Sequence, residues 1–222
     1  METRAIVIEN YGHADQLKES KVELPELGEH QALVKVHATS VNPIDWKLRE
    51  GYLAQMMPWE FPITLGWDVA GEITEIGSEV KDWQVGQKVF ARPETTRFGT
   101  YADYTIVDDH LLARKPDNVS FEEAAAVPLA GLTAYQALFT HGQLKAGEKV
   151  LIHAGAGGVG IYAIQLAKNA GATVITTASE KNHALLKELG ADQVIDYHTT
   201  DFSEVLENVD LVFDTMGGEV QA

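Results

Sequence analysis

The 222-residue sequence contains no cysteine. A chain without cysteine cannot form a disulfide framework, a thiolate zinc site or a cysteine nucleophile. This absence excludes disulfide-rich secreted domains, cysteine-ligated zinc modules and enzymes that use a cysteine nucleophile. The rest of the composition is that of a globular protein, because hydrophobic residues make up 45% and charged residues 23% of a chain long enough to bury a sizeable core.

Basic residues are also scarce. Lysine and arginine number 17 against 33 aspartates and glutamates, which gives a net charge of -16 at pH 7. This charge would repel a nucleic-acid backbone, and no basic stripe stands out in the sequence, so we expect no nucleic-acid partner. We interpret the excess acid as a solvated surface rather than as an acidic interaction tail.

Long hydrophobic runs are absent. The most apolar segment, residues 124–139, is shorter than a membrane-spanning helix and contains Pro128 and Gly131, so we expect a buried helix there. The apolar run within the opening METRAIVIENYG is interrupted by charges after four residues, which is too short for the core of a signal peptide. We therefore expect a cytoplasmic protein that has no membrane partner.

Two sequence patterns divide the chain near residue 122. In residues 32–38, Val34, Val36 and Ala38 alternate with Lys35 and His37, which is the period of a half-buried strand. Further strands over residues 69–77, 87–91 and 101–107 indicate a mostly antiparallel β domain in residues 1–122. The rest of the chain, residues 123–222, is expected to form an α/β domain of βαβ units on a parallel sheet, with strands over 149–154, 173–178, 193–196 and 210–215 and helices over 158–171 and 182–190.

A glycine-rich loop follows the predicted strand over residues 149–154. Gly155, Gly157 and Gly160 fit the pattern G-x-G-x-x-G between a strand and a helix, which is the setting that dinucleotide binding requires. The first glycine permits a tight turn, the second lets the backbone approach a pyrophosphate, and the third lets helix and strand pack closely. The helix is expected to end at Gly171 and to bury one apolar face, formed by Val159, Ala163, Leu166 and Ala170. A tight turn without a ligand is the alternative interpretation.

The end of the second strand of this domain indicates which dinucleotide binds. An acidic side chain there would hold the ribose 2′-hydroxyl of NAD, whereas a basic or hydroxyl group would accept the 2′-phosphate of NADPH. The strand over residues 173–178 runs into Ser179, Glu180 and Lys181. Glu180 suits NAD, but no acid lies on the strand end itself and Ser179 and Lys181 suit a phosphate, so the sequence favours NADPH.

Further motifs occur in a fixed order: SVNPIDWKLREG, PITLGWDVAGEITEIGSEV, GQKVFA, GTYADY, VPLAGLTAYQAL, HAGAGGVG and LGADQVIDY. Over essentially its whole length the sequence resembles the medium-chain dehydrogenase/reductase superfamily, and within it the zinc-free, zeta-crystallin-like NADPH:quinone oxidoreductases. The resemblance implies an N-terminal GroES-like β-barrel domain for the substrate, a Rossmann doubly wound parallel sheet for the cofactor, and a cleft between them.

The same superfamily includes zinc-dependent alcohol dehydrogenases, and this sequence departs from them. They carry a Cys ligand at the position of Asn42 and a His ligand within G-H-E, where this chain reads Gly66, Trp67 and Asp68. We therefore expect no metal site. Quinones and activated double bonds become the expected acceptors, because conjugation delocalises the charge of an incoming hydride without a Lewis acid.

The resemblance also implies roles for individual residues. On the cofactor side it places Thr133 near the nicotinamide, Gly157, Gly158, Val159 and Gly160 at the pyrophosphate, and Ser179, Lys181 and Tyr197 around the 2′-phosphate. On the substrate side it places Asn42 and Tyr52, where a hydrogen bond would steady a developing oxyanion.

The substrate-side residues have structural alternatives. Asn42 precedes Pro43 and suits a turn, Tyr52 follows Gly51 and suits packing, and Asp45 suits a structural role. Three aromatic residues can wall an apolar pocket, but we expect core packing for them: Trp59, Phe61 and Trp67.

The sequence therefore predicts an NADPH-dependent reductase of quinones or enones that works without zinc. A non-catalytic NADPH-binding sensor or structural protein, and less favourably a zinc alcohol dehydrogenase, remain as alternatives. Four strands are predicted from residue 149 onward, whereas a complete dinucleotide fold has six. We therefore expect the sequence to be incomplete at its C-terminus and to belong to a longer, homodimeric reductase.

Overall fold

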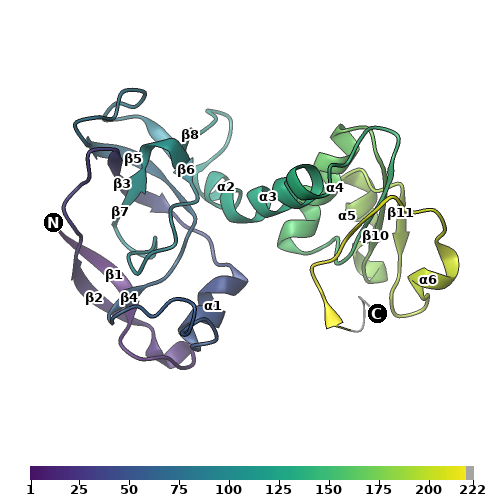
Figure 1. Cartoon of the computed structure of the whole chain (residues 1–222), viewed down its shortest axis with the longest axis horizontal. Coiled ribbons are helices and arrows are strands. Elements are labelled where there is room, and N and C mark those ends of the chain that lie inside the picture. Colours follow the sequence, from purple (N-terminus) through teal and green to yellow (C-terminus); the bar gives the residue numbers. More distant parts are fainter. Residues whose placement is uncertain (219–222) are drawn as a thin grey trace. The chain divides into compact units, whose positions relative to one another are not determined.

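The computed structural model describes residues 1–218 (Figure 1). The chain divides into two compact units, Met1–Leu129 and Ala130–Ala222. The division falls after Leu129 rather than near residue 122, where the sequence pattern changes. Helix α2 (Phe121–Ala125) packs on strands of the first unit, with Ala124 and Ala125 in an apolar cluster beside Ala70.

The first unit consists of two antiparallel sheets. The larger sheet has the order β7-β3-β5-β6-β8, formed by β3 (Gln31–Ala38), β5 (Val69–Ile76), β6 (Lys88–Ala91), β7 (Tyr104–Asp108) and β8 (Leu112–Arg114). The smaller sheet has the order β2-β1-β4, formed by β1 (Glu2–Ile8), β2 (Lys18–Glu23) and β4 (Ile63–Thr64). The predicted antiparallel domain is confirmed, and the smaller sheet is an addition that the sequence patterns did not indicate.

The core of the first unit follows the alternation of its strands. Val34 is buried while Lys35 and His37 are exposed, as the period of two predicts. A second cluster surrounds Trp67, whose side chain is fully buried among Ile8, Leu48, Ile63 and Leu65. Trp67 therefore packs in the core as expected.

The expectation of core packing is wrong for Phe61. Its side chain is 37% exposed and makes an edge contact with Tyr11 at 5.0 Å between ring centroids. Phe61 precedes Pro62 in a loop that leads into β4, so it lies at the rim of the cluster, while Trp59 is partly buried against it.

The apolar segment 124–139 is helical, but it is neither one helix nor fully buried. It contains the end of α2, then α3 (Pro128–Tyr135) and a π-helical turn, η3 (Gln136–His141). Pro128 begins a new helix because its missing amide donor is tolerated only in the first turn. Leu132 and Tyr135 are 46% and 51% exposed, because only the face of Ala130, Ala134 and Leu138 is buried.

The second unit contains the predicted parallel sheet. Its order is β11-β10-β9-β12, formed by β9 (Lys149–Ile152), β10 (Thr173–Thr177), β11 (Gln193–Ile195) and β12 (Leu211–Phe213). Helix α4 (Gly158–Asn169) contacts β9 and β10, and α5 (His183–Glu188) contacts β11. The predicted βαβ alternation is confirmed. Gly171 follows the C-terminal end of α4 with a left-handed φ of 83°, as predicted for the residue that ends this helix.

The buried face of α4 differs from the predicted one by about one position. The buried residues are Gly160, Ala163, Ile164 and Ala167, whereas Val159 and Leu166 only flank the core. The reason is the close approach at Gly160, where an added Cβ would lie 2.4 Å from the Ala154 carbonyl oxygen. A glycine is therefore required where the helix faces the loop, and Ala163, Ile164 and Ala167 follow Gly160 on the same side at helical spacing.

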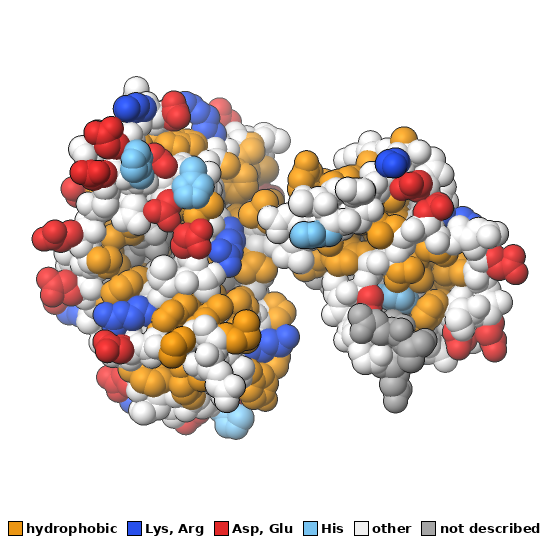
Figure 2. Space-filling view, in the orientation of Figure 1, with side chains coloured by type: hydrophobic (Ala, Val, Ile, Leu, Met, Phe, Trp, Pro, Cys, Tyr) orange, Lys and Arg blue, Asp and Glu red, His pale blue; other side chains and the backbone are white. Residues whose placement is uncertain are grey.

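The remaining elements are short: α1 (Pro43–Arg49), α6 (Phe202–Val205) and the 3-10 turns η1 (Ala14–Gln16), η2 (Asp109–Leu111) and η4 (Glu180–Asn182). Within residues 1–218, none of the helices has the length and apolarity to cross a membrane. Acidic and basic side chains are interspersed on the face shown in Figure 2, without a continuous basic stripe.

Candidate functional site

The glycine-rich loop connects β9 to α4 and is fixed by backbone hydrogen bonds. Ala154 adopts a left-handed conformation with φ 53°, and its carbonyl oxygen accepts a hydrogen bond from the Gly157 amide at 2.9 Å. The Gly155 amide donates to the carbonyl oxygen of Thr177 at 3.0 Å. The loop is therefore tied to the ends of both β9 and β10.

The glycines of this loop fall into two pairs. A Cβ on Gly155 would lie 2.0 Å from Thr176 Oγ1, and the Cβ of a residue at Gly160 would meet the Ala154 carbonyl. At Gly157 the nearest atom would be 3.2 Å away, and at Gly158 nothing lies within 4 Å. The first pair is needed for packing of the loop, whereas the second pair leaves a bare backbone surface.

This bare surface lies at the N-terminus of α4. Gly157 is the N-cap in an extended conformation and offers no side chain to the first amides of the helix. The first four amides of a helix have no partner within it, and the helix dipole places partial positive charge there. The geometry therefore fits a pyrophosphate, and the half-buried Val159 contributes only its backbone to this surface while its side chain packs on the core.

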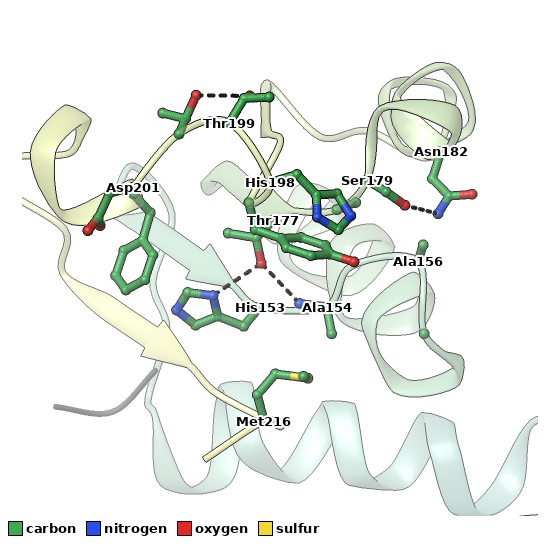
Figure 3. A pocket seen from close by; sticks show the side chains of 15 residues that line it. His153, Ala154, Ala156, Thr177, Ser179, Asn182, His198, Thr199, Asp201 and Met216 are labelled. Carbon is green, nitrogen blue, oxygen red and sulfur yellow. Dashed lines mark hydrogen bonds between the residues drawn. The ribbon is translucent and has the colours of Figure 1, made fainter. Parts of the chain in front are cut away.

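A cavity of about 770 Å³ opens beside the loop (Figure 3). Its size is in the range of cofactor sites. It is lined by His153, Ala154, Ala156, Gly157, Thr177, Ala178, Ser179, Asn182, residues 197–202 and Met216. Three residues of the predicted cofactor set, Gly157, Ser179 and Tyr197, thus meet in one cavity of the second unit.

The other predicted cofactor residues do not line this cavity: Gly155, Gly158, Val159 and Gly160 belong to the loop and the start of α4 beside it, and Thr133 and Lys181 lie elsewhere. Lys181 lies in the exposed turn η4, two residues after Ser179, and Thr133 lies on an exposed position of α3. The neighbouring Glu180, the candidate for NAD, is also exposed and outside the lining. The cavity instead contains Asn182, whose Nδ2 approaches Ser179 Oγ at 3.4 Å.

His153 forms part of the cavity wall and was not predicted as a site residue. It is buried just after β9, its Nδ1 lies 3.1 Å from Thr177 Oγ1, and its ring makes an edge contact with Phe202. Burial lowers the pKa of His153, and the charge of Asp214 only partly opposes this. His153 is therefore neutral at pH 7. Its place directly before the glycine loop is the one sequence signal that could have identified it.

In the first unit, the predicted substrate residue Asn42 belongs to a buried polar cluster around Asp68. The carboxylate of Asp68 is fully buried and accepts hydrogen bonds from Ser40 Oγ, from Asn42 Nδ2 at 2.7 Å and from the Leu129 amide at 2.7 Å. Burial raises the pKa of Asp68, and these hydrogen bonds only partly offset the effect. We refer to Ser40, Asn42, Asp68 and Leu129 as the Asp68 cluster.

Asn42 is also the N-cap of α1. The backbone amide of Asn42 donates to Asp45 Oδ2 at 2.5 Å, and Tyr101 OH donates to the same oxygen at 2.9 Å. Burial raises the pKa of Asp45. Burial also raises the pKa of Tyr101, with the Asp45 charge adding to the effect. Asp45 is thus a buried helix-capping residue, which agrees with the structural alternative for it.

The Asn42 side chain is held firmly. Its Nδ2 donates to Asp68 Oδ2 and to Ser40 Oγ, the latter at 3.1 Å. Both amide hydrogens are therefore used inside the Asp68 cluster, so one must be released before Asn42 can donate to a substrate oxygen.

Tyr52 is not a core aromatic. Its side chain is 67% exposed and makes an edge contact with Trp46 at 5.7 Å between ring centroids. Val41 and Met56 are exposed in the same region of the chain. Hydrophobic side chains gather around α1 on the face shown in Figure 2. Tyr52 is thus an exposed aromatic residue beside Trp46. We call the exposed apolar residues of this stretch of the first unit the α1 surface: Val41, Trp46, Tyr52 and Met56.

Comparison with protein families matches both units. Residues 28–117 match the alcohol dehydrogenase GroES-like domain, and residues 158–222 match the family described as zinc-binding dehydrogenase. The first unit therefore has the predicted GroES-like fold, and the second has the Rossmann-type parallel sheet.

Asn42 and Trp67 stand at the two positions where the zinc enzymes of the superfamily carry ligands, and their side chains do not suit zinc. Trp67 occupies the position of a His ligand, and its indole nitrogen carries a hydrogen and has no lone pair for a metal. Asn42 occupies the position of a Cys ligand and uses its amide within the Asp68 cluster. Among residues 1–218, no group of three or more His, Asp or Glu side chains is placed to hold a metal ion.

Several relatives match over nearly the whole chain. An NADPH-dependent alkenal/one oxidoreductase of Arabidopsis thaliana chloroplasts is 42% identical over 97% of the chain, which spans only 58% of that relative. The structure of the quinone oxidoreductase from Coxiella burnetii is 45% identical, with a TM-score of 0.91 over 99% of this chain and 70% of that chain. The Escherichia coli quinone oxidoreductase, solved in complex with NADPH, is 29% identical with a TM-score of 0.84 over 98% of this chain and 68% of that one. The chain therefore belongs to the quinone oxidoreductase group of the medium-chain dehydrogenase/reductase superfamily.

Proposed function

We propose that this chain forms the substrate domain and part of the cofactor domain of an NADPH-dependent reductase that acts on quinones or activated enone and enal double bonds. One observation carries the proposal: Ser179 and Tyr197 meet beside the bare backbone of Gly157 in one cavity of about 770 Å³. The names of the relatives support the same cofactor and the same acceptors, because one is an NADPH-dependent alkenal/one oxidoreductase and another a quinone oxidoreductase.

On the cofactor side, the proposal assigns the bare loop to the pyrophosphate. The amides of Gly158, Val159 and Gly160 at the start of α4 supply donors and the positive end of the helix dipole. Ser179 and Tyr197 are assigned to the 2′-phosphate, and Lys181 on the neighbouring exposed turn is assigned to the same phosphate from outside the cavity lining. Thr133 is assigned to the nicotinamide side of the cofactor. When bound, NADPH supplies the hydride.

On the substrate side, the proposal assigns the α1 surface to the acceptor. Exposed Trp46 and Tyr52 offer aromatic edges and faces to a flat conjugated molecule. Tyr52 OH and Asn42 orient the acceptor oxygen, and the Asp68 cluster fixes the position of Asn42. A reduced quinone collects its proton from water, so Tyr52 is not assigned as an indispensable acid and Tyr52→Phe is expected to cost about tenfold in kcat/KM rather than the loss of an essential acid.

The experiment that tests this function follows oxidation of NADPH by the full-length protein with a panel of small quinones, enals and simple aldehydes. Turnover of quinones or enals with NADPH, and slower turnover with NADH, is the expected result. Tight NADPH binding without turnover of any acceptor would instead establish the non-catalytic binding protein.

Zinc independence is a separate part of the proposal. It is supported by the buried Trp67 and the engaged Asn42 amide at the two positions where zinc enzymes of the superfamily carry ligands. Elemental analysis of the full-length protein is expected to show less than stoichiometric zinc, and activity is expected to survive chelation. One tightly held zinc per chain with loss of activity on its removal would establish the alcohol dehydrogenase alternative.

The proposal extends to a homodimer of the full-length protein in the cytoplasm. Strand β12 lies at the edge of the parallel sheet in the described part of the chain, and an edge strand supports a further pairing partner there. Light scattering of the full-length protein tests the dimer. Imaging of a tagged protein tests the compartment, and this matters because plant and animal relatives are named as chloroplastic and mitochondrial proteins.

A further inference from the structure

His198 occupies the cofactor cavity without a role in the proposed function. It follows Tyr197 in the loop after β11, its backbone amide donates to Asp196 Oδ1 at 3.0 Å, and its ring lies 4.2 Å from the Tyr197 ring. Figure 3 shows its imidazole on the side of the cavity where Ser179 and Asn182 lie, away from His153 and Asp201. The loop therefore presents an exposed imidazole beside the residues assigned to the 2′-phosphate.

The cavity lacks the cations that usually bind phosphate. No lysine or arginine occurs among the described residues that line it, and its titratable side chains are His153, Tyr197, His198 and Asp201. His153 is buried and neutral, and the Asp201 carboxylate already accepts hydrogen bonds from the Ser203 amide at 2.9 Å and hydroxyl at 2.7 Å. His198 is thus the one residue of this lining that can present a positive charge to a phosphate.

We propose that His198 binds the 2′-phosphate of NADPH together with Ser179 and Tyr197, and that its protonation makes the preference for a 2′-phosphorylated cofactor dependent on pH. This inference rests on the proposed NADPH site. An imidazolium donates a charge-assisted hydrogen bond to phosphate, which a neutral imidazole replaces only weakly.

Other charged groups around the loop set the background of this pH dependence. Asp196 precedes Tyr197 on the same loop, Glu180 and Lys181 lie on η4, and Asp201 begins α6. A phosphate monoester loses its last proton near pH 6. A change of preference with pH is therefore assigned to His198 by its loss in a variant that lacks the imidazole.

The test measures binding of two probes to the full-length protein by calorimetry: adenosine 2′,5′-bisphosphate and adenosine 5′-monophosphate, each at pH 6.5 and 8.5. The preference for the bisphosphate is expected to be about tenfold larger at pH 6.5 than at pH 8.5. His198→Gln is expected to lose this difference and leave binding of the monophosphate unchanged. His110→Gln, which changes an exposed histidine of the first unit, is expected to behave like the unchanged protein.

The other possible outcomes also test the role of His198. An unchanged preference and pH profile in His198→Gln would overturn the role of His198 while leaving the NADPH site in place. Equal affinity of the unchanged protein for both probes would refute the proposed NADPH preference itself. If His198→Gln weakens both probes, His198→Arg decides: a bisphosphate preference that is restored and equal at both pH values supports the proposal, and a preference that stays lost overturns it.

Discussion

The two candidate sites of this chain are built in different ways. In the second unit, the glycine-rich loop presents backbone amides from one short stretch of sequence, and its bare surface depends on the absence of side chains at Gly157 and Gly158. In the first unit, the Asp68 cluster joins side chains and a backbone amide, and its hydrogen bond from Leu129 to Asp68 spans 61 residues. The loop is a local structure, whereas the cluster exists only once the unit has folded.

Two carboxylates, Asp68 of the first unit and Asp192 of the second, behave in opposite ways. In the first unit, burial dominates at Asp68 and raises its pKa. In the second unit, burial also acts to raise the pKa of Asp192, but the Lys168 ammonium at 2.6 Å and the Val174 amide at 2.8 Å outweigh it, so the pKa is lowered. The folded chain therefore holds Asp68 at an electrostatic cost, whereas Asp192 stabilises the fold.

The largest effect is expected from Asp68→Ala. The change leaves the hydroxyl of Ser40, the amide group of Asn42 and the Leu129 amide without their acceptor. An unsatisfied buried donor costs about 1–3 kcal/mol, and water entering the space recovers part of this, so we expect a loss of about 3 kcal/mol in the free energy of unfolding. Urea unfolding followed by tryptophan fluorescence measures it, because all four tryptophans of this chain lie in the first unit.

The matched control for this prediction is Asp103→Ala in the same unit. Asp103 is half exposed and pairs with Arg4 at 3.0 Å, and an exposed ion pair contributes less than about 1 kcal/mol. Equal losses from the two substitutions would show that the Asp68 cluster is no more than another surface interaction. It would also remove the reason to regard Asp68 as the residue that positions Asn42.

The contrast between a local loop and a distributed cluster also explains what the sequence could predict. The parallel strands and the loop of Gly155, Gly157 and Gly160 were predicted because each is specified by residues a few positions apart. The Asp68 cluster was not predicted, because nothing in the sequence connects Asp68 to Leu129. The smaller sheet of the first unit was missed as well, since charged residues interrupt the apolar alternation of β1 and β2.

The cofactor cavity shows the same limit at closer range. Lys181 was placed at the 2′-phosphate because it follows the strand end by a few residues, yet the turn η4 leaves it outside the cavity lining. His198 lines the cavity because the next strand, β11, pairs with β10 and brings its own loop to the same edge of the sheet. The sequence therefore indicated that the cofactor site lies at the end of the sheet where these strands stop. It did not indicate which side chains of the following loops line the cavity.

A smaller effect is expected from a pair of substitutions in the loop. Gly155→Ala places a methyl group 2.0 Å from Thr176 Oγ1 and is expected to cost about 2 kcal/mol through overpacking. Gly158→Ala meets nothing within 4 Å and is expected to change stability by less than about 0.5 kcal/mol. Thermal unfolding followed by far-ultraviolet circular dichroism compares the two. Equal stability of both variants would show that the loop does not need its first glycine for packing.

The smallest effect concerns the pH dependence of stability. Because the pKa of Asp68 is raised, the folded chain binds more protons than the unfolded chain from about pH 4 upward, so the stability from this group is present below about pH 4 and is lost as the pH rises. Because the pKa of Asp192 is lowered, its stabilisation is present above about pH 4 and is lost as the pH falls. Relative to the unchanged chain, Asp68→Asn is therefore expected to gain stability between pH 4 and 7, and Asp192→Asn to lose stability between pH 3 and 5. Urea unfolding across this range measures both slopes, and slopes of the same sign would contradict the opposite roles of the two carboxylates.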